Sequence, residues 1–373
     1  MSEHLTGAYT RTEDAHALFA HLDAALRHTG VRLRGTVVAV DDGSDVPGLL
    51  RRRNSAVETV WSSPVAMCLQ LPYLRPTVPG QREASTGTVL VMPTDEPRLF
   101  LVLTVDPKDF VWQSLFPLIA RSAPRLFQPR ITSSSLAKLL SSSEQAAGLD
   151  YFEVTQVSAR SHLHERRRGK RFRSELMWTE ESTEDVLAAL RERGQWLHSV
   201  AFRYRILGSA GRLRCSARFS RQCSFAMQGE FSWSYHNPLQ SMIKDAAAAV
   251  RFYSNRGRTG TPRQEPRPVA IHYPDAVFHD KTKLRHLARV LHLMTRSSVS
   301  VLHANPYFRA SVVDFTDGSC YDIWVLSENS IIITPQLRAT SASMGRVCDH
   351  ILSWFGEGTL RDHYGIAESQ HNG

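Results

Sequence analysis

A run of cations in the middle of the chain has the clearest capacity for chemistry. Residues 160–173 carry six arginines, one lysine and one glutamate, a net charge of +6. Clustered cations favour a polyanion because each neutralised phosphate releases condensed counterions. Phe172 and Trp178 lie close by and could stack on bases. A solvated loop and an interface with an acidic protein are the alternatives. We expect nucleic-acid contacts from Arg160, Arg166, Arg167, Arg168, Lys170, Arg171 and Arg173.

A second set of cations recurs at helical spacing near residues 280–296. Its members lie four, four, three and four residues apart and share one helix face. They are Lys281, Arg285, Arg289, His292 and Arg296, opposite Leu284, Leu287, Leu291 and Met294. We expect Arg285, Arg289 and Arg296 to lie along a phosphate backbone. The alternative is the ordinary solvated face of an amphipathic helix, although a face without an acidic residue is less usual.

Arginines also alternate with aromatic residues in the expected strand that contains Phe202, Arg203, Tyr204 and Arg205. Alternation places Arg203 and Arg205 on one face of the sheet and the aromatic rings on the other. If the arginine face is solvent-exposed, it adds a basic surface beside residues 160–173. The ordinary pattern of a half-buried antiparallel sheet explains the aromatic residues equally well.

The nearest approach to a metal-dependent nuclease is Asp275 followed by Asp280 and Lys283. Such enzymes hold Mg²⁺ with carboxylates at strand ends and orient the attacking water beside it. Here the lysine falls in the first turn of the expected helix, and Asp280 is more simply an N-cap. A metal-dependent nuclease or hydrolase therefore remains the alternative function, and Mg²⁺ is expected only in that case.

Other groupings lack part of a metal or catalytic site. The carboxylate pairs have no matching lysine, and a His-x-His pair within an arginine run would repel a cation. These groupings are Asp150 with Glu153, Asp314 with Asp322, and His162 with His164. Neither a phosphate-binding loop, nor a dinucleotide fingerprint, nor a serine-hydrolase elbow occurs in the sequence. We therefore expect no cofactor and lean against enzymatic activity.

Charge and composition set the background for these sites. The formal net charge is +9, and the +6 of residues 160–173 and the +3 of residues 255–268 account for all of it. The chain has 39 arginines and 6 lysines, a skew typical of a GC-rich genome, so we predict a bacterial origin. The five cysteines are scattered, and we find neither a signal peptide nor a membrane span. A cytoplasmic protein that does not enter a membrane is the prediction.

The elements that must position these residues predict an α+β fold, with mixed or antiparallel sheets and flanking helices. A length of 373 residues indicates two domains or three. We expect an N-terminal α+β domain over 1–148 and a central meander-plus-helix region over 149–254 that could pack with it. A linker over 255–268 and a C-terminal β-α-β-β-β-β-α domain over 269–373 follow. We find no internal repeat in the sequence.

Some element boundaries are predicted by local signals. Thr12 is expected to cap the first helix, and residues 51–79 are expected to be irregular because prolines are scattered through them. Asn237 with Pro238 predicts the start of another helix. Helices are also expected over 280–295 and 341–355.

These features together predict an intracellular protein that binds DNA or RNA, and a subunit of a nucleic-acid processing or defence assembly is the role that we expect for it. The function would rest on phosphate contacts, because no base-reading module is visible. A non-catalytic subunit that binds a fixed protein partner, or a homo-oligomer, is the third hypothesis.

Overall fold

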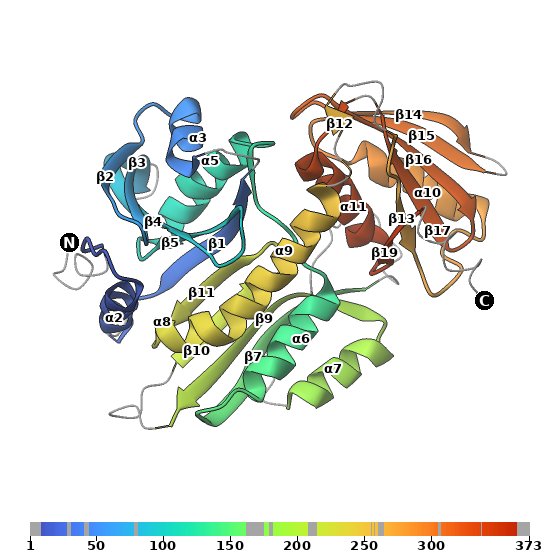
Figure 1. Cartoon of the computed structure of the whole chain (residues 1–373). Coiled ribbons are helices and arrows are strands. Elements are labelled where there is room, and N and C mark those ends of the chain that lie inside the picture. Colours follow the sequence, from blue (N-terminus) through green and yellow to red (C-terminus); the bar gives the residue numbers. More distant parts are fainter. Residues whose placement is uncertain are drawn as a thin grey trace. The chain divides into compact units, whose positions relative to one another are not determined.

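Figure 1 shows the computed structural model of the chain. It describes residues 9–27, 31–40, 45–77, 81–161, 175–178, 182–207, 215–254, 256, 258–259, 265–304, 307–336 and 338–363. The chain divides into two compact units, Met1–Ala248 and Ala249–Gly373. Each unit combines helices with antiparallel sheet, so the predicted α+β class is confirmed. None of the helices in the described part of the chain is long and apolar enough to cross a membrane.

The first unit is built on one eleven-stranded sheet. Its strand order is β2-β3-β4-β5-β1-β11-β10-β9-β7-β8, and β6 pairs with β1. The strands are β1 (Leu33–Val40), β2 (Glu58–Ser62), β3 (Met67–Pro76), β4 (Arg82–Pro93), β5 (Leu99–Thr104), β6 (Leu126–Phe127), β7 (Leu149–Ser161), β8 (Glu175–Trp178), β9 (Gln195–Ile206), β10 (Cys215–Ser220) and β11 (Ser224–Gln228). The antiparallel pairing of β1 with β11 joins the segments expected as 1–148 and 149–254 into one sheet.

Helical segments flank this sheet (Figure 1). They are α2 (Ala15–Leu26), α3 (Val46–Arg53), α4 (Lys108–Phe110), η1 (Val111–Leu115), α5 (Phe116–Arg121), α6 (Ser133–Glu144), α7 (Thr183–Glu192), α8 (Phe231–Ser234), η2 (Tyr235–Leu239) and α9 (Gln240–Ser254). Side-chain caps define several starts, because an oxygen accepts from an otherwise unpaired N–H of the first turn. Asp14 caps α2 by accepting from Ala17 N at 2.9 Å, so the predicted cap at Thr12 is wrong by two residues.

One core of the first unit lies between strands β1 to β5 and the helices α3 to α5. Phe110 is fully buried and its ring lies over Gly87 of β4. A Cβ atom at Gly87 would meet the Phe110 ring at 2.3 Å, so only glycine lets this ring approach the sheet. Phe110 also makes an edge contact with Tyr73 of β3, with ring centroids 5.2 Å apart. This packing fixes the helical segment against the sheet.

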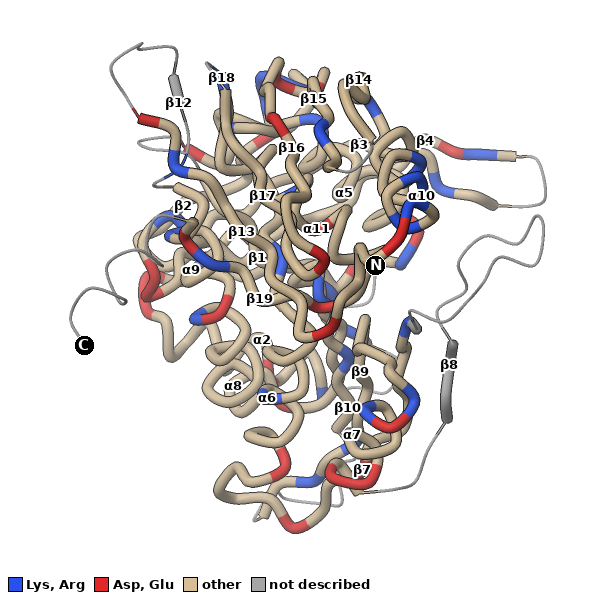
Figure 2. Tube along the Cα trace, turned by 90° about the vertical axis from the view of Figure 1, so that its right-hand side faces the viewer, with Lys and Arg blue, Asp and Glu red and all other residues tan. Residues whose placement is uncertain are grey.

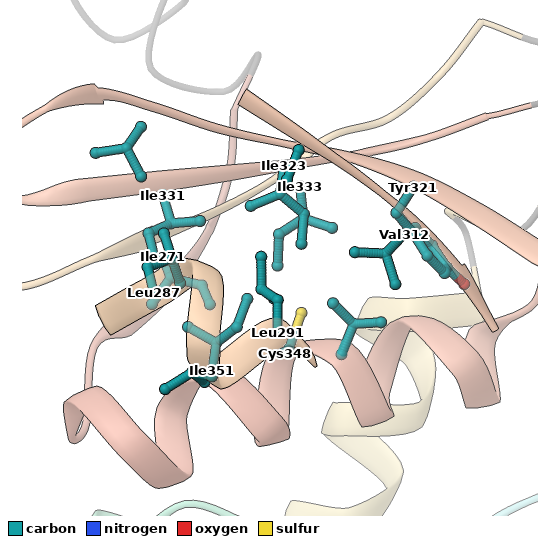
Figure 3. Packing of buried hydrophobic residues seen from close by; sticks show 14 of the residues in the cluster. Ile271, Leu287, Leu291, Val312, Tyr321, Ile323, Ile331, Ile333, Cys348 and Ile351 are labelled. Atoms are coloured by element: carbon teal, nitrogen blue, oxygen red, sulfur yellow. The ribbon is translucent and has the colours of Figure 1, made fainter. Parts of the chain in front are cut away.

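The second unit has a six-stranded antiparallel sheet of order β14-β15-β16-β17-β13-β19 and a small two-stranded sheet of β12 and β18. The strands are β12 (Arg258–Thr259), β13 (Val269–His272), β14 (Ser297–Ala304), β15 (Phe308–Asp314), β16 (Ser319–Ser327), β17 (Ser330–Pro335), β18 (Arg338–Ala339) and β19 (Thr359–Asp362). Helices α10 (Lys281–His292) and α11 (Ser341–Phe355) share a core with one face of the sheet. Figure 3 shows Leu287 and Leu291 of α10 and Ile351 of α11 meeting the aliphatic residues of this face.

Two parts of the chain share one topology. Residues 33–121 run β-α-β-β-β-β-helix with the sheet order β2-β3-β4-β5-β1. Residues 269–355 repeat that sequence of elements, with the order β14-β15-β16-β17-β13 and only the short β18 added before α11. Helix α3 thus corresponds to α10, and α5 to α11. This repeat cannot be seen in the sequence, because many different apolar residues satisfy the same strand alternation and helical periodicity.

Two sequence predictions about the first unit are wrong. Residues 51–79 are not irregular, because they contain the end of α3 and strands β2 and β3. Asn237 and Pro238 do not begin a helix, because α8 begins at Phe231 and Pro238 lies within the π-helical turn η2. The wider turn tolerates a residue without an N–H, and the Asn237 side-chain amide donates to the Trp233 carbonyl at 2.9 Å.

Candidate nucleic-acid interface

Helix α10 is held by a cap at its start and by an apolar face along its length. The Asp280 carboxylate accepts from Lys283 N at 2.7 Å and so closes the first turn. Leu284, Leu287, Val290 and Leu291 are buried against the core of the second unit. This burial determines which side of α10 meets solvent. The leucine side cannot leave the sheet without exposing these apolar residues to water.

The solvent side of α10 carries the predicted stripe of cations. Lys281, Arg285, Arg289 and His292 are exposed, and so is Arg296 just beyond the helix. We call these five residues the α10 basic face. Within the part of the chain that the structure describes, no carboxylate lies in ion-pair range of its lysine or arginines. Figure 2 shows the blue segments along α10. The face therefore keeps its full charge available for an external anion.

Two features at the ends of α10 oppose local stability. The first turn of α10 contains no acidic side chain and carries Lys281 and Lys283, where the helix dipole is positive. Cations at this end are unfavourable by roughly 0.3–1 kcal/mol each. Arg296 has a φ of 57°, in the left-handed region that favours glycine. The Asp280 carboxylate at the N-cap offsets part of the cost of the two lysines, and a bound anion at this end would offset more of it.

The corresponding helix of the first repeat, α3, carries cations that need no ligand. Arg51, Arg52 and Arg53 are exposed in the last turn of α3, where the helix dipole is negative. The Arg51 guanidinium also donates to the Thr59 hydroxyl of β2. Local electrostatics therefore accounts for these three arginines, and also for Arg289 and His292 in the last turn of α10, but it does not account for Lys281 or Arg285.

The arginines of the central meander lie on a solvent-facing side of the sheet, as the alternation predicts, but that side is mixed in charge. Arg203 lies 3.9 Å from the Glu153 carboxylate of the neighbouring strand β7. Arg205 donates to both carboxylate oxygens of Asp150, at 2.7 and 2.9 Å. Both acids come from β7, whose register against β9 places Glu153 opposite Arg203. The expected all-basic surface is wrong here, because two of its arginines are already paired with acids.

Only the first cation of the run 160–173 lies in the described part of the chain. Arg160 is half-buried in β7, opposite Trp196 of β9. Arg166, Arg167, Arg168, Lys170, Arg171 and Arg173 lie outside the described residues. The prediction for this segment therefore stays a prediction.

The second basic segment, 255–268, is described in part, and Arg256 within it has a structural role. Arg256 is buried, and its guanidinium donates to the Pro268 carbonyl at 3.0 Å and to the Asp362 carboxylate at 3.1 Å. It also stacks on the Phe252 ring at 4.1 Å. These contacts tie the end of α9 to β13 and β19, so this charge is unavailable to a ligand.

The residues considered for a nuclease are not brought into a metal site. Asp280 is the N-cap of α10, and the hydrogen bond from Lys283 N lowers the pKa of its carboxyl. Asp275 and Lys283 are exposed. Among the described residues, no three His, Cys, Asp or Glu side chains lie together as metal ligands would. The geometry gives Asp280 a structural role.

The other carboxylate pairs from the sequence are engaged in hydrogen bonds. Asp314 accepts from Ser343 Oγ at 2.8 Å and from Arg346, while Asp322 accepts from Ser311 Oγ at 2.6 Å and from Arg309 at 3.2 Å. Asp314 is buried and anchors α11, whereas Asp322 lies on the half-exposed face of the sheet. Each carboxylate has a structural explanation.

A buried polar cluster in the first unit was not signalled by the sequence. Asp106 follows β5, and its carboxylate accepts from Thr88 N at 2.6 Å. The Tyr9 hydroxyl lies 3.4 Å from the same oxygen. Burial raises the pKa of Asp106, and the hydrogen bonds only partly offset it. No cation within the described part of the chain forms an ion pair with Asp106, so its charge is costly in the folded state.

This cluster makes a prediction about pH. A carboxyl whose pKa is raised by folding costs stability as the pH rises above the ordinary aspartate value. The unfolded chain then releases its proton while the folded protein still holds it, and this ionisation favours the unfolded chain. We expect the Asp106→Asn variant to gain stability relative to the wild type between pH 4 and neutrality, an interval set by the ordinary value of about 3.9. Urea unfolding of both proteins at several pH values measures the difference. A difference that is constant with pH would contradict the prediction.

Comparison with known proteins adds no assignment to this geometry. The sequence matches no known protein-family model and has no significant similarity to any curated protein.

Proposed function

We propose that this protein binds a nucleic-acid phosphate backbone through the α10 basic face. The observation that carries the proposal is the alignment of exposed cations on α10 with no ion-pair partner among the described residues. Arginine and lysine in such an arrangement bind phosphates with affinity that comes from counterion release. The arginines of the meander are paired with acids, and the arginines of α3 are consecutive residues that do not share one helix face.

The dimensions of α10 suit a phosphate backbone. A helix of 12 residues is about 18 Å long, at roughly 1.5 Å per residue. Duplex DNA carries one charge per ~1.7 Å of its axis, so this length faces about ten phosphate charges. The three permanent cations of the face on that length, with Arg296 just beyond it, bind without reading bases. Binding is therefore expected to depend on duplex geometry and salt more than on sequence.

The remaining expectations follow from this ligand. All five cysteines are free thiols, and four of them are buried, which supports a reducing compartment such as the cytoplasm. Backbone binding without base contacts supports a role as a subunit of a DNA or RNA processing or defence assembly, where a partner or a guide supplies specificity. The bacterial origin rests on the arginine skew alone.

Salt titration is the experiment that tests the proposal. Labelled duplex DNA, duplex RNA and single strands are titrated with the full chain between about 50 and 200 mM salt, where phosphate-binding proteins change most. We expect log affinity to fall linearly with log salt, with a slope of about −0.9 per phosphate contact on duplex DNA. The absence of binding at low salt, or an affinity independent of salt, would overturn the proposal.

A further inference from the structure

Strand β14 is an edge of its sheet, and its one irregularity against β15 lies near its end, between Val301 and His303, so the stretch before it has little of the usual protection. Edge strands carry unpaired N–H and C=O groups, and natural proteins guard them with charge, short length or covering segments. β14 has eight residues, none of them Lys, Arg, Asp or Glu, and Val301 and Leu302 are 37% and 56% exposed. An edge of this kind is a site for another strand.

The other described edges are guarded. β2 has five residues, begins with Glu58, and is irregular between Thr59 and Trp61. Its Trp61 indole also donates to the Tyr9 carbonyl at 2.8 Å, which ties the N-terminal segment to this edge. β19 and β8 have four residues each, and β19 includes Arg361 and Asp362. β14 alone among these edges is both long and uncharged.

The hydrogen-bond pattern identifies which groups of β14 face outward. Phe315 N donates to the Arg296 carbonyl at 2.8 Å, which marks 296 and 315 as a hydrogen-bonded pair between β14 and β15. Such pairs alternate along an antiparallel ladder, so Ser297, Val299 and Val301 make none with β15. Their N–H and C=O groups point to the open edge. Three successive outward residues can therefore pair with a new strand.

We propose that this edge pairs with β14 of a second copy of the chain. An antiparallel pairing about a two-fold axis at Val299 uses all three outward residues. Val299 then lies opposite itself, Ser297 opposite Val301 of the second copy, and Ser298 opposite Ser300. No like charges meet, because the strand contains none. This self-complementarity favours a second copy over an unrelated strand.

The dimer has a consequence for the proposed function. Helix α10 packs on β14 and β15, so both copies of α10 lie on one face of the joined sheet. The two α10 basic faces are then neighbours across the two-fold axis, and one nucleic acid can contact both. This consequence rests on the proposed function, whereas the strand pairing does not. A dimer should show about twice the salt slope of a monomer on the same duplex.

Charge pairs at Ser298 and Ser300 test the register, since both serines are exposed. Sedimentation velocity over a concentration series should show a wild-type dimer. The S298K/S300K variant places like charges opposite each other and should weaken dimerisation at least tenfold. The S298E/S300K variant places opposite charges together and should restore it. Leu326→Lys, at an exposed residue of β16, is the control and should leave dimerisation unchanged.

Several outcomes would overturn the pairing. The pairing is rejected if the wild type stays monomeric. It is also rejected if the S298K/S300K variant dimerises as tightly as the wild type. Equal weakening by both double variants also rejects this register. Circular dichroism and the unfolding temperature check that each variant folds. If the S298K/S300K variant does not fold, the dimerisation of the S298E/S300K variant still tests the pairing. A monomer that binds duplex with the expected salt slope rejects the dimer alone, and a dimer that binds no nucleic acid rejects the proposed function alone.

Discussion

A variant carrying Lys281→Gln, Arg285→Gln and Arg289→Gln should lose most of its affinity for nucleic acid while remaining fully folded. Each phosphate contact contributes about one to the slope of log affinity against log salt, so three losses should lower the slope by about three. Stability should change little, because the three side chains make no ion pair with described residues, and the gain from removing Lys281 at the start of α10 offsets the loss of Arg289 from its last turn. Fluorescence anisotropy over a salt series measures the slope, and urea unfolding measures the stability.

A matched control removes the same charge from a corresponding helix. The variant Arg51→Gln, Arg52→Gln, Arg53→Gln takes three exposed cations from α3, which is the counterpart of α10 in the repeat. It should keep the wild-type salt slope. If both triple variants lose affinity equally, net charge and not the α10 basic face carries the binding.

The cations outside the described residues call for a separate variant. Replacing Arg166, Arg167, Arg168 and Arg171 by alanine tests whether residues 160–173 add contacts of their own. Independent contributions would lower the slope by about four beyond the α10 effect. An unchanged slope would assign the run to solubility or to a protein partner.

Local patterns were sufficient to predict most of the second unit. The C-terminal helix was expected over 341–355 and is found at Ser341–Phe355, because an N-cap at Thr340 and a long apolar stripe leave little freedom. The stripe of cations on α10 was also predicted, since the spacing between residues along a helix decides which of them share one face. These features need no knowledge of distant segments.

Features set by distant strands could not be predicted in the same way. The acids that neutralise Arg203 and Arg205 lie some fifty residues earlier, and only the register of β7 against β9 brings them together. The strand β3 was missed because prolines usually break strands, although Pro72 and Pro76 are exposed positions of β3. The open edge of β14 follows from the strand order of the sheet, which single-strand periodicity does not contain.

Removal of the Asp314 carboxylate should destabilise the second unit more than any surface change. Asp314 is 2% exposed, and it accepts from Thr316 N at 2.9 Å, from Ser343 Oγ at 2.8 Å and from Arg346. Asp314→Ala leaves these donors without their acceptor. Breaking such a buried network costs about 3–5 kcal/mol, and because a third of the Arg346 side chain is exposed we expect about 2–4 kcal/mol.

A double-mutant cycle with Arg346→Met separates the ion pair from the other hydrogen bonds of Asp314. The losses of unfolding free energy caused by the two changes should be less than additive, because each change alone already removes the Asp314–Arg346 ion pair. Chemical unfolding must be followed for both units, since two compact units need not unfold together. The consequence reaches the candidate interface: α11 holds α10 through the hydrogen bond between His350 Nε2 and the Val290 carbonyl, 2.7 Å long. A loss below 1 kcal/mol, or full additivity, would show that the Asp314–Arg346 ion pair does not anchor α11.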